Sequence, residues 1–129
     1  MKKNVLISGI TGQDGLFLTS QLLKCNEYKI LGITRNKENK SFYKKLEHLG
    51  VKNSELENLD IVKCSLMNLE ELTSVVDGFK PYQVYNLAGP GSVSESVKKP
   101  SETKTSIMTS FDNLIEALIE SNNFASFFQ

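Results

Sequence analysis

The sequence predicts an α/β domain built on a doubly wound parallel sheet, with about five strands and helices on both faces. Two observations lead to this prediction. Short apolar segments of strand length alternate with segments whose apolar residues recur at helical spacing, from residue 4 to the end of the chain. A glycine-rich turn lies between the first apolar segment and the first helical one. Strands joined through helices require right-handed crossovers, and therefore a parallel sheet.

The first strand and helix are expected on either side of the glycine-rich turn. Residues 4–8 form a β-branched, apolar segment that ends at Gly9, which is typical of a buried strand. A helix is expected between Gly15 and Cys25, with Asn26 as its stop residue. The apolar side of this helix is predicted to contain Leu18, Leu22 and Leu23, with Phe17 adjacent.

A second strand is expected over residues 29–34, and polar, Lys/Glu-rich sequence follows over residues 36–58. In that polar stretch Phe42, Leu46 and Leu49 keep helical spacing. It is therefore interpreted as a loop that carries one exposed helix.

The third and fourth strands are expected over residues 59–64 and 82–87. Between them Asn68 is a typical N-cap for a helix, and Gly78 with Pro81 is expected to end it. The apolar face of this helix is predicted to contain Leu69, Leu72, Val75, Val76 and Phe79.

A long helix is expected after Pro100, and a fifth strand over residues 124–129. The helical spacing rests on Ile107, Phe111, Leu114, Ile115, Leu118 and Ile119. The strand is rich in phenylalanine, so its exposed edge is a candidate for pairing with further sheet or with another copy of the chain.

The composition is that of an ordinary globular domain. Of 129 residues, 40% are hydrophobic and 23% charged, so we expect one domain with one core. The 15 basic and 15 acidic residues balance, which argues against nucleic acid or an anionic membrane as a partner. No segment reaches the roughly 18 apolar residues of a membrane span or resembles a signal peptide, so a cytoplasmic protein is expected.

Metal and acid–base chemistry receive little support from the sequence. Cys25 and Cys64 are far apart and form no Cys-x-x-Cys pattern, so we expect reduced thiols, no disulfide and no metal site. His48 and the pair Glu70-Glu71 are interpreted as surface residues rather than catalytic groups.

The glycine-rich turn Gly9-Ile10-Thr11-Gly12-Gln13-Asp14-Gly15 predicts dinucleotide binding. The first glycine permits the tight turn, the second lets a pyrophosphate approach the backbone, and the third allows close packing of the helix on the sheet. The helix N-terminus then offers N–H groups to the phosphates. The alternative is a glycine-rich turn in an α/β domain without a ligand. A P-loop is excluded because no Gly-Lys-Ser/Thr follows.

The end of the second strand predicts NADP rather than NAD as the cofactor. NAD-specific domains place a carboxylate about 20 residues after the glycines, where it binds the ribose 2′-hydroxyl. Here the sequence is Ile33-Thr34-Arg35-Asn36-Lys37, which has no carboxylate. Arg35 and Lys37 suit a 2′-phosphate, although a solvated basic loop is the alternative.

Four segments together carry a resemblance to a known family: the turn at residues 9–15, Gly32-Ile33-Thr34-Arg35, Leu46-Glu47-His48-Leu49 and Tyr85-Asn86-Leu87-Ala88-Gly89. On these segments the chain resembles the extended short-chain dehydrogenase/reductases, and within them the GDP-mannose 4,6-dehydratases and their nucleotide-sugar relatives. The resemblance implies a Rossmann-type NAD(P)-binding domain over residues 1–129, as the N-terminal portion of a longer, homo-oligomeric enzyme acting on a nucleotide sugar, foremost GDP-mannose.

Carried over residue by residue, the resemblance also implies a set of cofactor contacts. Ser65 stands where the family has an aspartate near the adenine, and Asn36 where it has a second arginine. The implied contacts are Gly9, Ile10, Thr11, Gly12, Gln13, Asp14 and Gly15 at the pyrophosphate; Arg35, Asn36 and Lys37 at the 2′-phosphate; Ser65 and Leu66 at the adenine; and Leu87, Ala88, Gly89 and Gly91 beside the nicotinamide.

The catalytic groups that the resemblance implies are missing from the chain. The related dehydratases use a tyrosine with a lysine four residues later, and none of the four tyrosines here has that lysine. We therefore assign no catalytic residue and expect the chain alone to be inactive. Two alternatives stay open: an NDP-sugar 4-epimerase or reductase of the same family, and a stand-alone dinucleotide-binding module without catalysis.

Overall fold

The computed structural model describes residues 2–35, 39–87, 111–121, 123 and 125–128. Within these residues one five-stranded sheet has the order β3-β2-β1-β4-β5, and every neighbouring pair is parallel. Its strands are β1 (Lys3–Ser8), β2 (Tyr28–Thr34), β3 (Leu59–Lys63), β4 (Gln83–Asn86) and β5 (Ser126–Phe128). The strand order reverses between β1 and β4, which confirms the doubly wound arrangement predicted from the sequence.

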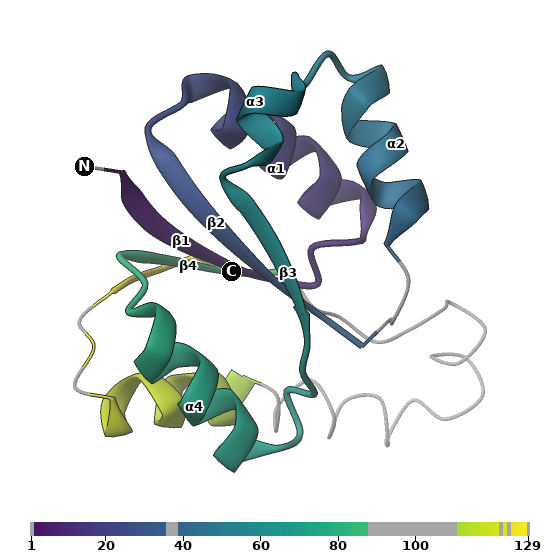
Figure 1. The fold of residues 1–129 in the computed structure, drawn as a ribbon. Helices are drawn as coiled ribbons and strands as arrows, with labels where there is room; N and C mark the ends of the chain where they lie inside the picture. The colour runs from purple at the N-terminus through teal and green to yellow at the C-terminus, as the bar shows by residue number, and fades with distance from the viewer. Residues whose placement is uncertain (1, 36–38, 88–110, 122, 124, 129) are drawn as a thin grey trace, which may run out of the picture.

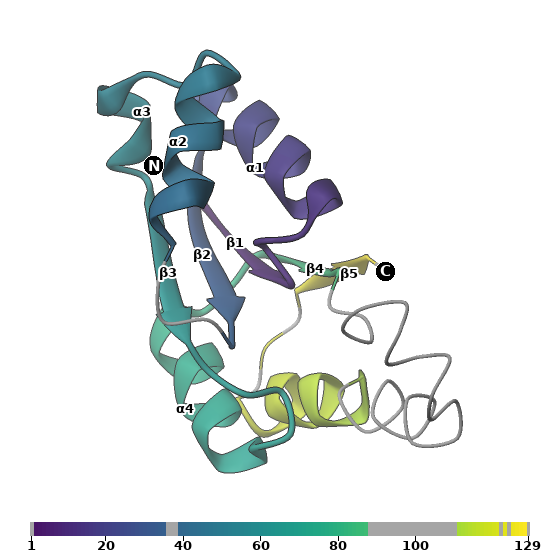
Figure 2. The same cartoon turned by 90° about the vertical axis from the view of Figure 1, so that its right-hand side faces the viewer.

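Helices cover both faces of the sheet (Figure 1). On one face lie α1 (Gln13–Cys25), α2 (Lys40–His48) and α3 (Asn53–Leu56). On the opposite face lie α4 (Leu69–Phe79) and a helix over residues 111–120, and Figure 2 shows the two layers from the side. None of the helices in the described ranges is both long and apolar enough to cross a membrane.

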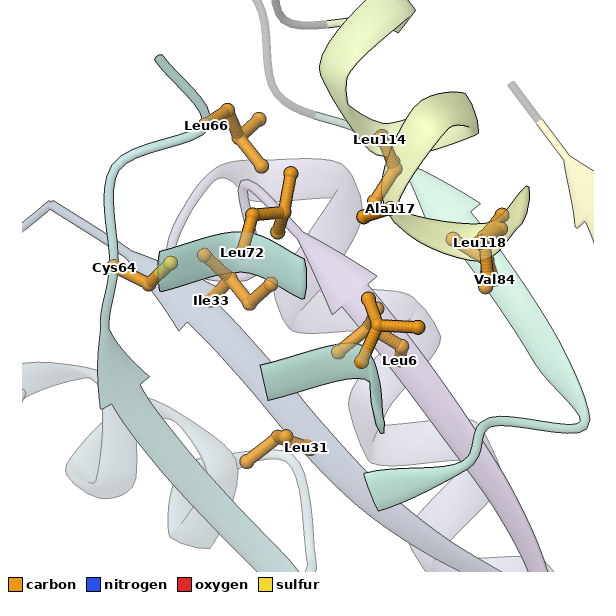
Figure 3. Packing of buried hydrophobic residues seen from close by; sticks show 11 residues of the cluster. Leu6, Leu31, Ile33, Cys64, Leu66, Leu72, Val84, Leu114, Ala117 and Leu118 are labelled. Carbon is orange, nitrogen blue, oxygen red and sulfur yellow. The ribbon is translucent and has the colours of Figure 1, made fainter. Parts of the chain in front are cut away.

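The sheet divides the interior into two clusters, where the sequence analysis expected one core. Alternate residues of a strand point to opposite faces, so β1 sends Val5 and Ile7 to one cluster and Leu6 to the other. The first cluster lies under α1 and α2 and contains Val5, Ile7, Ile10, Leu23, Ile30, Phe42, Leu46, Val51 and Leu59. The second lies under α4 and helix 111–120, and Figure 3 shows its members Leu6, Leu31, Ile33, Cys64, Leu66, Leu72, Val84, Leu114, Ala117 and Leu118.

The segment between β2 and β3 contains two helices, where the sequence predicted one. The predicted anchors Phe42 and Leu46 are buried on α2, as expected. The four-residue α3 was missed because it buries no residue and shows no apolar period. It begins where the Lys52 N–H donates to the Glu55 carboxylate at 2.8 Å.

Both ends of α4 lie where the sequence predicted them. Asn68 is the N-cap, and its side chain accepts a hydrogen bond from the Glu71 N–H at 3.0 Å, as expected. The helix ends at Phe79, between Gly78 and Pro81, as the sequence predicted. The chain turns at Lys80, whose φ of 54° is the left-handed conformation that glycine adopts most readily.

The last two elements agree with the sequence over the residues described. Helix 111–120 buries Leu114 and Leu118 against the sheet as predicted, but Ile119, which the helical spacing grouped with them, is 64% exposed. The strand β5 pairs with β4, and the Phe128 ring stacks on Tyr85 with 4.8 Å between ring centroids. Ile107 and Phe124, which contributed to these predictions, lie outside the described residues.

Candidate dinucleotide-binding site

The loops that follow β1, β2, β3 and β4 meet at the carboxyl edge of the sheet. Three backbone hydrogen bonds tie them together: Leu87 N–H to Ser8 O at 3.1 Å, Gly9 N–H to Ile33 O at 3.2 Å, and Cys64 N–H to Thr34 O at 3.0 Å. The glycine-rich turn after β1 therefore lies between the ends of β2 and β4. This edge, at the reversal of strand order, is where ligands of open α/β sheets bind.

The glycine-rich turn leads directly from β1 into α1. Gly9 has a φ of 66°, which a residue with a side chain adopts only with strain. The Gly12 N–H closes the turn by donating to Gly9 O at 3.1 Å, and Leu16 N–H donates to Gly12 O at 2.9 Å to begin the helix. The first glycine is thus required by the turn, as the sequence predicted.

Gly15 is required by packing between the helix and the turn. It is buried, and a Cβ added there would lie 2.7 Å from the backbone Cα and C atoms of Ile10. Ile10 itself is fully buried, and its side chain lies against Gly32 of β2, where an added Cβ would lie 2.7 Å from Ile10 Cγ2. The Ile10 side chain, at one of the predicted pyrophosphate contacts, is therefore engaged in packing inside the fold.

Gly12 differs from the other two glycines because no contact within the described part of the chain requires it. It is exposed, its φ is −75°, and the nearest atom to an added Cβ is Gly9 O at an ordinary 3.5 Å. Gly12 is also the N-cap of α1, where it has no side chain to bond the first N–H groups of the helix. The backbone at this end of α1 is open to a partner that brings its own acceptors, such as a phosphate.

The predicted 2′-phosphate residues are partly described. Arg35 is exposed and directly follows Thr34, the buried last residue of β2. It is the only arginine in the sequence. Asn36 and Lys37 lie outside the described residues.

The two predicted adenine contacts, Ser65 and Leu66, lie in the loop after β3 and differ in how their side chains are engaged. Ser65 is half-buried, and its Oγ accepts a hydrogen bond from the Met67 N–H at 3.1 Å. The Leu66 side chain is 9% exposed and packs in the cluster under α4. Ser65 thus keeps a hydroxyl hydrogen to donate, whereas the Leu66 side chain is engaged in packing.

The carboxyl ends of β1 and β4 carry a buried polar pair that the sequence analysis did not select. Ser8 Oγ donates to Asn86 Oδ1 at 2.6 Å, and the two side chains are 0% and 6% exposed. The sequence could have indicated this pair, because Ser8 and Asn86 are polar residues that each end an apolar strand. The next residue, Leu87, is half-buried beside the turn, and Ala88, Gly89 and Gly91 lie outside the described residues.

Three further titratable side chains that the structure describes are Cys64, Tyr43 and His48. Burial raises the pKa of the Cys64 thiol to about 11, and the nearby Glu71 carboxylate adds to the shift. On α2, burial and Asp60 raise the pKa of Tyr43. His48 is exposed at the end of α2, as expected. Among the residues with described structure, no group of three or more His, Cys, Asp and Glu is arranged to hold a metal ion.

Comparison with known proteins assigns this arrangement of strands and turns to a family. The family model for GDP-mannose 4,6 dehydratase matches residues 6–129. GDP-mannose 4,6 dehydratase 1 of Arabidopsis thaliana is 33% identical over 124 residues, which cover 94% of this chain and 34% of that protein. GDP-mannose 4,6-dehydratase of Vibrio cholerae is 31% identical over 105 residues, covering 80% of this chain and 27% of that protein. The chain therefore spans about a third of the length of these relatives.

Solved structures with the same fold include sugar-nucleotide epimerases. UDP-glucose-4-epimerase from Stenotrophomonas maltophila, with bound NAD and formylated UDP-arabinopyranose, matches with a TM-score of 0.74 and 17% identity, covering 94% of this chain and 34% of the other. UDP-glucose 4-epimerase from Brucella ovis, in complex with NAD, matches with a TM-score of 0.68 and 20% identity, covering 93% and 33%. At these identities the likeness confirms the Rossmann-type fold.

Proposed function

Because this chain belongs to the GDP-mannose 4,6-dehydratase family, we propose that residues 1–129 are the NADP-binding N-terminal portion of a nucleotide-sugar 4,6-dehydratase. The substrate proposed for the whole enzyme is GDP-mannose, which is oxidised at C4, loses water and is reduced at C6. NADP supplies the acceptor and donor of the hydride in this reaction. The proposed role of the described residues is to bind and orient that cofactor.

The exposed glycine at the start of α1 is the observation that supports cofactor binding most directly. The turn requires Gly9 and the packing of Ile10 requires Gly15, but none of the residues described in the structure requires a glycine at position 12. A pyrophosphate at this place would require a residue without a side chain, because the phosphate must approach the backbone closely. It would also accept hydrogen bonds at a helix N-terminus that has no capping side chain.

The choice of NADP rests on the end of β2. The exposed Arg35 directly follows the strand, where a NAD-specific domain would have a carboxylate. A guanidinium binds a phosphate through two parallel charge-assisted hydrogen bonds, which a neutral ribose hydroxyl cannot match. We propose that Arg35, with Asn36 and Lys37, binds the 2′-phosphate.

The other parts of the cofactor are proposed to contact the neighbouring loops. The Ser65 hydroxyl is proposed to donate to the adenine, with Leu66 beside it, while Leu87, Ala88, Gly89 and Gly91 line the nicotinamide side. No catalytic residue is proposed in this chain, so the chain alone is expected to bind NADP without turning over a sugar. The unpaired thiols of Cys64 and the exposed Cys25 support a reducing, cytoplasmic location.

Calorimetric titration of the chain with NADP and NAD tests cofactor binding and preference. We expect tighter binding of NADP, and a loss of that preference in Arg35→Ala. Lys29→Ala is the matched control, because Lys29 is an exposed cation at the opposite end of the same strand. Equal affinity for the two cofactors, or an Arg35→Ala variant that still prefers NADP, would contradict the proposed 2′-phosphate site.

The reaction is tested on the longest product of the same reading frame, supplied with GDP-mannose and NADP. Formation of the 4-keto-6-deoxy sugar nucleotide supports the dehydratase, whereas a C4 epimer supports the epimerase alternative. Cofactor binding without turnover by the complete product would instead support a stand-alone binding module.

A further inference from the structure

We propose that Asn113, on helix 111–120, is a positioning residue for cofactor binding, because it holds the loop between β3 and α4 in place. This inference rests on the proposed function, which places the adenine beside that loop. Asn113 itself is not proposed to touch the cofactor. Its Nδ2 donates a hydrogen bond to the Leu66 backbone carbonyl at 2.8 Å, across 47 residues of sequence.

The loop at residues 65–68 has a defined shape through its own hydrogen bonds. The Met67 N–H donates to Ser65 Oγ at 3.1 Å, and the Asn68 N–H donates to Ser65 O at 3.1 Å. These two bonds form within the loop, so they shape it without joining it to the rest of the fold. Asn68 joins the loop to α4, where its Oδ1 accepts the Glu71 N–H, and the bond from Asn113 joins the loop to helix 111–120.

Leu66 is held from two sides. Its side chain is buried in the cluster that also contains Leu114, the residue next to Asn113 (Figure 3). Its carbonyl accepts the Asn113 amide, so the backbone of Leu66 is joined to helix 111–120 while its side chain is held in the cluster. Because Ser65 is bonded to Leu66, the direction of the Ser65 hydroxyl depends on this contact.

The chemistry of the contact allows a specific substitution. A carbonyl oxygen only accepts hydrogen bonds, so the partner at position 113 must donate. An aspartate has the shape of asparagine, but its ionised form only accepts and would repel the Leu66 oxygen. Its protonated form can donate through the carboxyl O–H. Asn113→Asp should therefore lose the contact at neutral pH and regain it as the pH falls through the carboxyl pKa.

The test measures the affinity for NADP by calorimetry in wild type, Asn113→Ala and Asn113→Asp. We expect about a three- to tenfold weaker affinity in both variants near neutral pH, the effect of one lost hydrogen bond. In Asn113→Asp the ratio to wild type at the same pH should return toward one as the pH falls, while in Asn113→Ala it should not. Comparison with wild type at each pH removes the titration of the cofactor phosphates.

Asn123→Ala is the matched control for a general loss of stability. Asn123 follows the same helix, and its Oδ1 accepts a 2.8 Å hydrogen bond from the Ala125 N–H, but this contact lies where the chain enters β5. We expect Asn123→Ala to bind NADP like wild type. Equal weakening by Asn123→Ala and Asn113→Ala would overturn the inference, as would an affinity in Asn113→Asp that does not depend on pH relative to wild type.

The outcomes separate this inference from the proposed function. If wild type does not bind NADP, the proposed function fails. If wild type binds NADP and both Asn113 variants bind as tightly, the proposed function stands and the positioning role is overturned. Amide hydrogen exchange at Met67 and Asn68 without cofactor gives a second measurement, and we expect faster exchange in Asn113→Ala than in Asn123→Ala.

Discussion

Ser8 and Asn86, the last residues of two neighbouring strands, are joined by a buried 2.6 Å hydrogen bond between their side chains. The same two strand ends are joined through the backbone, since the Leu87 N–H donates to Ser8 O at 3.1 Å. The bond lies directly beneath the glycine-rich turn. It couples the two loops proposed to contact the pyrophosphate and the nicotinamide.

Ser8→Ala is expected to lower the free energy of unfolding by about 1–3 kcal/mol, because it removes the hydroxyl that satisfies the buried Asn86 Oδ1. Urea denaturation monitored by circular dichroism measures the change. Ser54→Ala, which alters an exposed serine of α3, is the control and should change stability by less than about 0.5 kcal/mol. Equal changes in the free energy of unfolding for the two substitutions would show that the buried hydrogen bond does not stabilise the fold.

Gly12→Ala is expected to weaken NADP binding more than it lowers stability, whereas Gly15→Ala is expected mainly to lower stability. Gly12 is exposed with room for a methyl group, so Gly12→Ala should cost about 1 kcal/mol or less and weaken NADP binding at least about tenfold. Gly15→Ala places a methyl group against the Ile10 backbone, so it should lower the stability by several kcal/mol, about 3 or more. Thermal unfolding and calorimetry measure the two effects. A Gly12→Ala variant that folds and binds NADP normally would contradict the proposed pyrophosphate site.

The sequence predicted the elements whose signal is local. Each strand is a short apolar run, and α4 combines an N-cap asparagine with apolar residues at helical spacing, so these elements were found within one or two residues. The positions of Gly9 and Arg35 follow from the same pattern, because a loop at the end of a parallel strand must lie at the carboxyl edge of the sheet.

Contacts between distant residues were not predictable in this way. The sequence indicated leucines as the buried face of α1, but Gly15, Thr19 and Ser20 are buried beside Leu23 because the helix approaches the sheet closely. Leu18 and Leu22 are only half-buried, and Phe17 is 47% exposed.

The contacts that shape the site depend in the same way on which strands become neighbours. Gly32 makes room for Ile10, Ser8 bonds Asn86, and Asn113 bonds Leu66. None of these pairs is close in sequence, so no local pattern reports them.

Cys64 is expected to react slowly with iodoacetamide in the folded protein. Burial and the Glu71 carboxylate raise its pKa to about 11, so the thiol stays protonated near neutral pH, and only the thiolate is a good nucleophile. Mass spectrometry of labelled peptides should show the exposed Cys25 modified first, and both thiols modified together in urea. Equal rates for the two thiols in the folded protein would contradict this expectation.

The same shift predicts a loss of stability at alkaline pH. The pKa of Cys64 is higher in the folded protein than its ordinary value of 9.0, so its contribution is complete below pH 9 and is lost as the pH rises toward 11. Urea denaturation should show a smaller decrease in the free energy of unfolding between about pH 8 and 10 for Cys64→Ala than for wild type. A parallel decrease in both proteins would exclude Cys64 as a cause.

Lys80→Gly is expected to stabilise the protein by about 1 kcal/mol, because glycine adopts the left-handed conformation at the end of α4 without the strain of a side chain. Lys80→Ala removes the same charge but keeps a Cβ, so it should give no such gain. The midpoint of thermal unfolding measures both changes. Equal stabilisation by the two substitutions would point to the lost charge rather than to the backbone.

Thr19 offers the last test, because its hydroxyl is buried on α1 without a hydrogen-bond partner among the residues described. Thr19→Val replaces this hydroxyl with a methyl group of similar size, so the free energy of unfolding should rise by about 1 kcal/mol. Thr73→Val is the matched control, since the Thr73 hydroxyl donates to Leu69 O at 2.7 Å on α4. Removing this hydrogen bond should lower the free energy of unfolding. Urea denaturation measures both variants. Destabilisation by Thr19→Val would show that this hydroxyl has a partner in solution, which makes the sign of the change the deciding result.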